Sequence, residues 1–304
     1  MRSPQQAIFL EDSDHHLWLE YDLLPGAEIR DVREAVRLAL EVPRDSRVDS
    51  ERRPRCVIAF GPVLWSRLAT ERVPQGLHLF EGIDGPEGHH APPTPHNIWI
   101  WLHGDHHDEN VAAALGVHRA LRSVARLAAE EHGFRYRDSL DLTGFVDGTA
   151  NAKGAERQVV ALIPSRQRGG GGSHVLAQRW VHDLRRWEAL SDAQQSKIMG
   201  RTKDGNEELK GRAMPKHAHV ARTDIEVEGE AQPVYRRSVP FGGVREHGLY
   251  FVAFANSSKR FDALLESMFG VTDGVHDRLL DFSRATSGAY YFAPSQEDLD
   301  SALK

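Results

Sequence analysis

The sequence predicts an α+β protein built from two similar halves. Over the first 140 residues, the apolar patterns follow the order strand, helix, strand, strand, helix, strand, which is typical of a ferredoxin-like unit. Residues 141–304 give a comparable outline without obvious sequence repetition. A chain of 304 residues is long enough for two domains. We therefore expect an N-terminal domain over 1–140 and a C-terminal domain over 141–304, related as a duplicated fold.

Residue spacing supports the elements of the N-terminal half. Val32, Val36 and Leu40 repeat at helical spacing, and Pro43 ends that helix. Residues 97–102 are aromatic and β-branched, as in a buried strand. We expect strands at 7–10, 16–23, 56–60 and 97–102, helices at 29–41, 63–68 and 111–131, and a loop at 82–96.

The C-terminal half carries clear signals for helix ends. Ser191 opens a helix with Gln194 in the capping-box position, and Ser257 and Ser258 cap a second helix that Gly270 ends. The glycine-rich run 166–173 lacks the Gly-Lys-Ser/Thr element of a phosphate loop, so we expect a flexible loop. We expect strands at 158–163, 174–184, 249–254 and 289–293.

Composition excludes several classes of protein. A formal charge of −6 argues against a general nucleic-acid binder. The single cysteine, Cys56, rules out an intramolecular disulfide framework and a Cys-ligated zinc or iron–sulfur centre within one chain. The N-terminus lacks the features of a signal peptide, and no run approaches the length that crosses a bilayer. We therefore expect a cytoplasmic protein with no membrane partner.

The segment 141–151 is the most distinctive in the chain. Its core, 144–149, brackets a hydrophobic pair and the carboxylate of Asp147 between two glycines. Glycine permits backbone conformations and close approaches that a Cβ would block. Asp-Gly is also a common turn dipeptide. Taken alone, the segment therefore fits either a tight bend against a bulky group or a surface turn.

The whole segment resembles the Gly-x-x-Asp-Gly signature of the dye-decolourising peroxidases, a family of haem enzymes, and is most similar to the compact bacterial type B or P subclass. Four further segments match the family in order, at 178–184, 217–222, 236–242 and 288–294. The resemblance implies two ferredoxin-like halves of the dimeric α+β barrel type, with antiparallel sheets packed together. Haem b would be held mainly by the C-terminal half.

The resemblance also implies an activity. The protein would reduce hydrogen peroxide through a ferryl intermediate and oxidise dyes, phenolics or other small-molecule or aromatic one-electron donors. Members of the family assemble, so a homo-oligomer is expected. No nanocompartment-targeting tail is expected, because Lys304 follows soon after the terminal motif.

Family roles carry over to individual residues. His219 is the expected iron ligand, because the family's ligand directly precedes an apolar residue with an arginine two positions beyond; His217 is the competitor. Asp147 would act as general acid–base and Arg236 as a fixed positive charge. Ser238 would order distal water. In a strand, Arg236 and Ser238 would share one face while the intervening arginine points away.

The resemblance gives further haem contacts. The imidazole of the ligand should donate its second N–H to a carboxylate, for which Asp281 is the candidate and Asp277 the alternative. Arg201 would pair with a haem propionate. The other expected contacts are Thr149 and Asn151 at the haem edge and Leu249, Phe251 and Phe254 on the distal wall.

Two other functions compete with the peroxidase. A non-catalytic haem-binding or haem-delivery protein, or one that removes iron from haem, would need His219 but not Asp147 or Arg236. A metal-binding module could use the histidines and aspartates of 103–108, either alone or together with His89 and His90. Those residues lie in expected loops without a defined ligand spacing.

Overall fold

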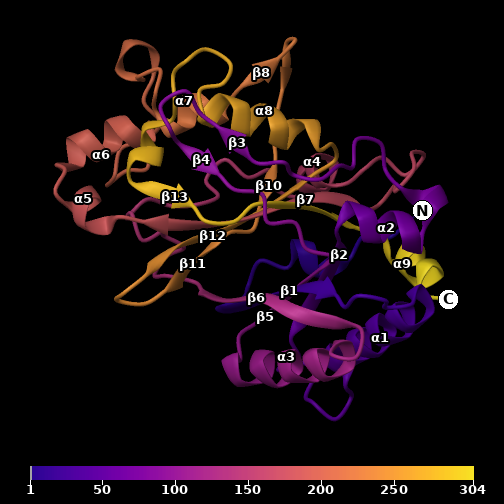
Figure 1. The fold of residues 1–304 in the computed structure, drawn as a ribbon. Helices are drawn as coiled ribbons and strands as arrows, with labels where there is room; N and C mark the ends of the chain where they lie inside the picture. The colour runs from indigo at the N-terminus through magenta and orange to yellow at the C-terminus, as the bar shows by residue number, and fades with distance from the viewer. Residues whose placement is uncertain (1) are drawn as a thin grey trace.

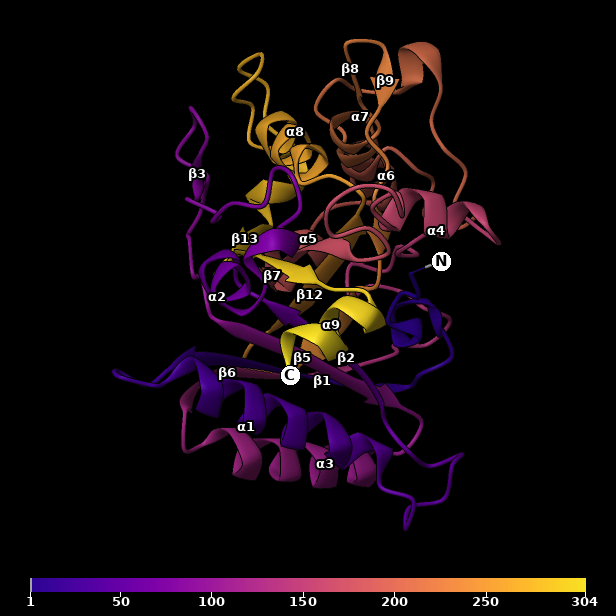
Figure 2. The same ribbon diagram turned by 90° about the vertical axis from the view of Figure 1, so that its right-hand side faces the viewer.

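A computed structural model describes residues 2–304, and its main strands form a closed antiparallel ring with helices outside it (Figures 1 and 2). The ring order is β12-β11-β6-β1-β5-β2-β14-β7, and pairing of β7 with β12 closes it. Its strands are β1 (His15–Leu23), β2 (Arg55–Phe60), β5 (Ile98–Gly104), β6 (Ala125–Phe134), β7 (Ser173–His182), β11 (Val239–Gly242), β12 (His247–Ala255) and β14 (Ala289–Ala293).

The remaining elements surround this ring. Short strands β3 (Ile83–Asp84) and β4 (His90–Ala91) form one hairpin, β8 (Glu226–Val227) and β9 (Glu230–Ala231) form another, β10 (Tyr235–Arg236) pairs with β12, and β13 (Ser283–Ala285) pairs with β7. The α-helices are α1 (Ile29–Glu41), α2 (Pro62–Leu68), α3 (His107–Leu121), α4 (Glu156–Ala161), α5 (Leu184–Glu188), α6 (Asp192–Met199), α7 (His219–Thr223), α8 (Lys259–Met268) and α9 (Gln296–Ala302). Within residues 2–304, no helix is both long and apolar enough to span a membrane.

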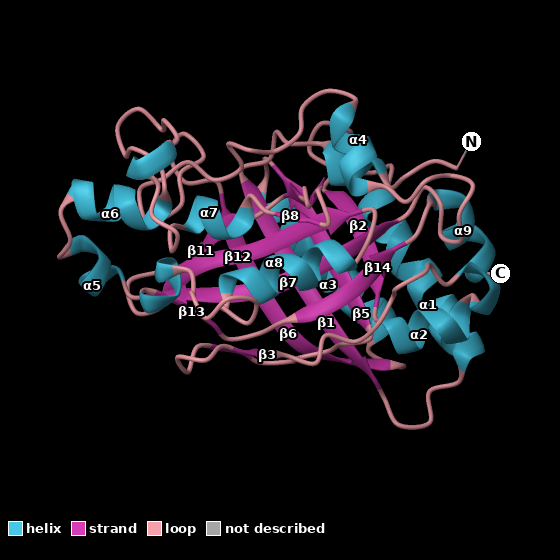
Figure 3. Ribbon diagram, turned by 90° about the horizontal axis from the view of Figure 1, so that it is seen from above, coloured by secondary structure: helices cyan, strands magenta, loops and turns pink. Residues whose placement is uncertain are grey.

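The two halves of the chain each contribute one side of the ring. The N-terminal half supplies β6-β1-β5-β2, with α1 and α3 side by side on its outer face (Figure 2). The C-terminal half supplies β11-β12-β7-β14, with α7 and α8 over its outer face (Figure 3). The halves join at two seams, where Phe241 pairs with Gly133 and Phe60 pairs with Phe292. The expected α+β class, antiparallel sheets and two-part barrel are confirmed.

Aromatic side chains from both halves fill the inside of the ring. Trp18 of β1 stacks on Tyr250 of β12 with ring centroids 4.2 Å apart, and both side chains are buried. Tyr250 and Tyr291 both donate hydrogen bonds to the buried carboxylate of Glu20. Burying each large apolar side chain contributes about 1.5–3 kcal/mol, so this interior holds the halves together.

The outer face of the C-terminal sheet has its own apolar layer. Successive strand residues point to opposite faces. Leu249 and Phe251 of β12 therefore point outward to the layer under α8, whereas Phe254 lies inside the ring. The prediction that Phe254 shares the distal wall with Leu249 and Phe251 was wrong. Phe254 is three residues after Phe251, and residues an odd number of positions apart in a strand point to opposite faces of the sheet. Residues at 249, 251 and 253 share the outer one.

Most elements lie where the sequence predicts them. The expected loop at 82–96 contains the short hairpin of β3 and β4, and three further segments differ from the prediction. Residues 7–10 were expected to be extended, but Gln6–Phe9 is a 3₁₀ helix. Residues 158–163 were expected as a strand, but Glu156–Ala161 is helical. The helix expected over 111–131 ends at Leu121, and β6 begins at Ala125. Short apolar runs fit either period, so residue spacing alone did not separate these cases.

Two predicted helix caps have different outcomes. The capping box of Ser191 and Gln194 is present, and Gly200, at φ 85°, ends α6. Ser258 stands at the N-cap position of α8, but its hydroxyl donates to the Gly76 carbonyl instead of capping. Gly270, at φ 72°, follows α8 as predicted.

Candidate active site

A cavity of about 310 Å³ lies on the outer face of the C-terminal sheet, beneath α8. Its volume falls within the range of about 300–1,000 Å³ that is usual for small-molecule and cofactor sites. Much of the wall is apolar, and it includes Leu176, Leu249, Phe251, Ala253, Phe261, Leu264, Leu265, Met268 and Leu280. The ionisable or amide side chains on the wall include Asp141, Asp147, Gln178, His182, Arg201, Glu208, His219 and Arg236. The fold therefore offers an apolar pocket with a few polar groups.

His219 is the first residue of α7 and lines this cavity. Its Nδ1 lies 2.6 Å from Oδ2 of Asp277, whose side chain is fully buried. A carboxylate accepts hydrogen bonds, so Nδ1 of His219 donates to Asp277, and Nε2 has no hydrogen-bond partner within residues 2–304. Oδ1 of Asp277 accepts from the Leu279 amide at 2.9 Å, which fixes the carboxylate. Asp277 thus holds the His219 imidazole in one orientation.

Asp281, expected as the carboxylate partner of His219, does not fill that role. Asp277 is the N-cap of the 3₁₀ helix Arg278–Asp281 and faces His219, whereas the turn of that helix carries Asp281 away. Asp281 instead contacts Nε2 of His276 and Nε of Arg278, each at 3.1 Å. The alternative carboxylate, Asp277, is therefore the one that contacts the imidazole.

The other histidines near the cavity offer no free nitrogen to it. His182 lines the wall, but its Nδ1 lies 2.8 Å from the Ser283 hydroxyl and its Nε2 lies 3.2 Å from Asp141. Burial acts to raise the pKa of Asp141, but hydrogen bonds from His182 and Thr143 outweigh it and hold the pKa below its usual value. His217 is not among the residues of the wall. Of the histidines on the described wall, His219 has the unengaged nitrogen.

Asp147 and Arg236 form an ion pair on the cavity wall. Nη1 of Arg236 lies 3.6 Å from Oδ1 of Asp147, and each side chain is about one-fifth exposed. Oδ1 of Asp147 also accepts from the Gly148 amide at 2.6 Å. Gly144 and Gly148 have φ of 87° and 76°, a region that favours glycine. The two glycines therefore make the tight bend that presents Asp147 to the cavity.

Asn151 holds the strand that carries Arg236. Its side-chain amide donates to the Arg236 carbonyl at 2.8 Å and accepts from the Arg236 amide at 2.9 Å. Asn151 was expected at a haem edge, but it is not among the cavity-lining residues. Its amide is occupied by the β10 backbone, so Asn151 supports Arg236 from behind.

The neighbours of Arg236 follow the alternation of a strand. Arg237 points into the interior of the closed sheet, where it donates hydrogen bonds to the carbonyls of Ile8 and Leu10. Its guanidinium carbon Cζ lies 4.9 Å from the centroid of the Trp101 indole. Ser238 is not among the cavity-lining residues; its hydroxyl accepts from the Val252 amide at 3.2 Å. This backbone contact leaves the expected water-ordering role of Ser238 without support.

The remaining expected residues lie on the wall. Leu249, Phe251, Thr149 and Arg201 all line the cavity. Arg201 is already paired with Glu208 at 2.9 Å. An anionic group at Arg201 would therefore compete with that carboxylate.

Sequence reasoning missed one polar residue of the wall, Gln178. Its side chain is 1% exposed, and its Nε2 has no hydrogen-bond partner within residues 2–304. Leaving a buried donor unsatisfied costs about 1–3 kcal/mol, so an acceptor at this position would be stabilising. Alternation along β7 was the available signal, because Leu176, Gln178 and Trp180 all line the cavity.

Known proteins similar to this chain share one family description. The family models described as Dyp-type peroxidase, N-terminal and C-terminal, match residues 5–135 and 138–298. A dye-decolorizing peroxidase of Mycobacterium tuberculosis is 35% identical over 249 residues, covering 80% of this chain and 74% of that protein. One from Rhodococcus erythropolis is 34% identical, covering 80% and 73%.

Solved structures agree with this sequence similarity. A Dyp-type peroxidase of Shewanella oneidensis superposes with a TM-score of 0.91 at 31% identity, covering 100% of this chain and 98% of that one. A DypB variant of Rhodococcus jostii, solved in complex with haem, gives a TM-score of 0.90 at 32% identity and covers 99% of each chain.

Proposed function

Because the chain belongs to the Dyp-type peroxidase family, we propose that it is a haem b peroxidase that reduces hydrogen peroxide and oxidises dyes, phenolics or other one-electron donors. Its high mutual coverage with DypB of Rhodococcus jostii supports the type B or P assignment. The gap between the two family models, from 135 to 138, supports a domain boundary near residue 140.

The cavity is suited to a haem group. Its walls are largely apolar, as a porphyrin requires, and His219 offers a nitrogen with an available lone pair. The buried amide of Gln178 would gain a hydrogen-bond partner from a polar group bound in the cavity. Arg201 is the candidate partner for a propionate. Haem, when bound, supplies the redox-active iron on which peroxide is reduced.

His219 would hold the iron through Nε2. Asp277 accepts the proton on Nδ1, and such a carboxylate fixes the ring and raises the basicity of the ligating nitrogen. Because Asp277 is fully buried and anchored by the Leu279 amide, it holds the ring with little freedom. An imidazole so arranged is the usual proximal ligand of haem peroxidases.

Asp147 and Arg236 would act on the peroxide. Oδ1 of Asp147 is engaged by the Gly148 amide and Arg236, so Oδ2 is the oxygen that takes a proton from one peroxide oxygen and returns it to the other. Arg236 stays protonated at any ordinary pH and stabilises the negative charge that develops as the O–O bond breaks.

One observation carries this proposal: the same cavity is lined by His219, with its unengaged nitrogen, and by the Asp147–Arg236 pair. The test is the absorption spectrum of purified protein after haem loading. We expect His219→Ala to lose the Soret band and His217→Ala, two residues away and off the cavity wall, to keep it. Equal spectra for both variants would reject His219 as the ligand.

A second measurement separates a peroxidase from a haem carrier. Asp147→Asn should bind haem as the unchanged protein does, but should oxidise dye about 10²–10⁴-fold more slowly, because general acid–base catalysis contributes that much. If the unchanged protein binds haem and turns over no dye with peroxide, it is a haem-binding or haem-delivery protein instead. Release of iron-free porphyrin would indicate haem iron removal.

A further inference from the structure

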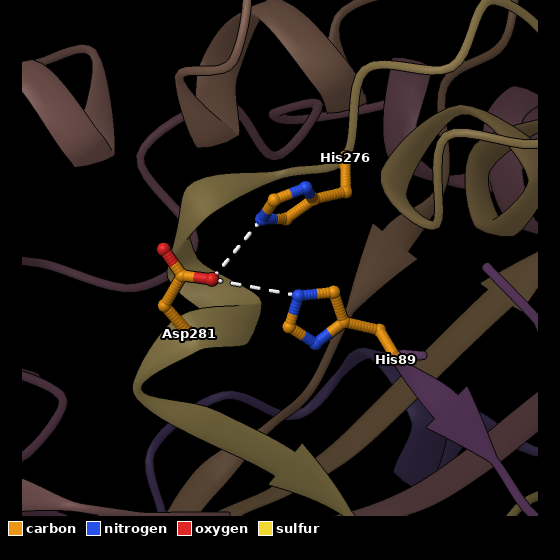
Figure 4. Close-up of side chains that lie close together, drawn as sticks. All are labelled: His89, His276 and Asp281. Carbon is orange, nitrogen blue, oxygen red and sulfur yellow. Dashed lines mark hydrogen bonds and ion pairs between the residues drawn. The ribbon is translucent and has the colours of Figure 1, made fainter. Parts of the chain in front are cut away.

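Three side chains of metal-binding type converge outside the cavity wall (Figure 4). They are His89 in the β3–β4 hairpin, His276 in the loop after α8, and Asp281 at the end of the 3₁₀ helix. Their ligating atoms all lie within 4.8 Å of one another. Within residues 2–304, no other group of three such side chains meets this criterion, so the histidines and aspartates of 103–108, the alternative metal site considered from the sequence, do not form one.

The spacing of these atoms suits a tetrahedral ion. Oδ1 of Asp281 lies 3.1 Å from Nε2 of His276 and 3.4 Å from Nε2 of His89. Ligands about 2.0–2.2 Å from a tetrahedral zinc ion are about 3.3–3.6 Å apart. Small shifts of the side chains would therefore place all three atoms around one ion.

Further side chains hold two of the three groups in place. Oε2 of Glu87 lies 3.3 Å from Nδ1 of His276, and Arg278 holds Oδ2 of Asp281 at 3.1 Å. Metal-binding histidines usually donate their second N–H to a carboxylate in this way. Arg278 leaves Oδ1 of Asp281 facing the two rings (Figure 4).

His276 has a carboxylate beside each of its ring nitrogens. Oε2 of Glu87 lies beside Nδ1, and Oδ1 of Asp281 lies beside Nε2. An ion bound between Nε2 of His276 and Oδ1 of Asp281 would therefore have a ligand atom of each residue directed towards it.

We propose that His89, His276 and Asp281 bind one divalent transition-metal ion of the zinc type. The three side chains are 12–24% exposed, which leaves room for a water molecule as fourth ligand. The ion joins a hairpin of the N-terminal half to the segment 276–281 of the C-terminal half. That segment also contains Asp277, the partner of His219.

The test is a calorimetric titration of the haem-loaded, tag-free and chelator-stripped full chain with Zn²⁺. We expect one tight site per chain, and a loss of affinity of at least about 10-fold in His89→Ala and in Asp281→Asn. His90→Ala is the matched control, because His90 lies in the same hairpin and pairs with Asp84 instead. It should bind Zn²⁺ as tightly as the unchanged chain.

Thermal unfolding gives a second readout. An ion that binds only the folded chain stabilises it, so Zn²⁺ should raise the Tm of the unchanged chain and of His90→Ala but not of His89→Ala. Absence of a tight site would overturn the proposal, as would equal affinity in all variants, which would assign binding to other histidines. The haem spectrum and dye turnover are measured separately, so this result is independent of the peroxidase proposal.

Discussion

At the scale of single side chains, the sequence did not determine which of two nearby aspartates contacts His219. Asp277 and Asp281 lie four residues apart in one short segment, and only the first contacts His219. The choice depends on which aspartate caps the 3₁₀ helix, and Asp277 does so through the Leu279 amide. The sequence could limit the partner to these two residues, but the cap geometry decides between them.

We expect Asp277→Asn to lower dye turnover by about 10–100-fold with haem still bound, because the imidazole loses the charge of its hydrogen-bond acceptor. Steady-state oxidation and the Soret absorbance are the measurements. Asp273→Asn serves as control, since Asp273 lies in the same loop and pairs with Arg222. Equal losses of turnover in the two variants would point to a general effect of charge.

Arg236 and Arg237 are adjacent in the sequence, but their substitution should have different effects. Arg236 faces the cavity and Arg237 faces the ring interior, as strand alternation predicts. Arg236→Leu should lower kcat/KM for peroxide by about 10²–10³-fold while changing Tm little, because a catalytic charge is removed from a partly exposed site. Rapid mixing with peroxide and thermal unfolding are the measurements.

Arg237→Leu should do the opposite, because it leaves the buried carbonyl of Ile8 and the partly buried carbonyl of Leu10 without donors. We expect the folded state to lose about 1–3 kcal/mol per unsatisfied group, while the folded fraction keeps its reactivity. If Arg237→Leu lost the peroxide reaction and Arg236→Leu kept it, the register of this strand would be wrong.

Among strands and helices, β7 and β12 position the cavity wall by alternation. Every second side chain of β12 from Leu249 reaches the cavity side, and Tyr250 and Phe254 fill the ring. The sequence predicted both strands and the α8 stripe, because their apolar patterns are strong. It misassigned 125–131, because Leu127 and its neighbours fit a helical continuation as well as the strand that pairs with β1.

The side chain of Asn151 holds the short strand β10 in place through the backbone of Arg236. Asn151→Ala removes two hydrogen bonds to the Arg236 backbone and should destabilise the chain by about 1–3 kcal/mol in urea unfolding. Because Arg236 would lose its support, kcat/KM for peroxide should fall, with KM for the dye unchanged. Asn151→Asp keeps the acceptor for the Arg236 amide, so its stability and its kcat/KM for peroxide should lie between those of the unchanged chain and of Asn151→Ala. A change in dye KM alone would contradict this positioning role.

Across the molecule, the buried carboxylate of Glu20 connects the two halves through Tyr250 and Tyr291. Burial raises its pKa, although hydrogen bonds from Tyr291 and Tyr250 oppose the rise. In the pH range above the ordinary glutamate pKa of about 4.3, the folded chain therefore holds a proton that the unfolded chain has released. This group's contribution to stability is present below that range and falls as pH rises through it.

We expect Glu20→Gln to reduce the drop in unfolding free energy between pH 5 and pH 8, because the amide does not ionise. Urea unfolding at both pH values measures this, with the exposed Glu156→Gln as control. An unchanged drop in Glu20→Gln would show that other groups set the pH dependence.

The two seams of the ring were beyond sequence reasoning. Each half could be recognised from its own strands, but the pairs Phe241–Gly133 and Phe60–Phe292 join segments far apart in the chain. Gly133 gives a physical reason for the first seam, since a Cβ there would lie 2.6 Å from Val239 and 2.7 Å from Trp18. Such close packing between distant strands leaves no periodic signal.

The second seam has a consequence for biosynthesis. Phe60 pairs with Phe292, so one edge of β2 stays unpaired until β14 has been synthesised. Pairing of strands so far apart in the sequence is slow. Until it occurs, the unpaired N–H and C=O groups of β2 can pair with other nascent chains. The ring should therefore close only after β14 has left the ribosome, and the yield of folded protein in cells should depend on chaperones that cover β2 until then.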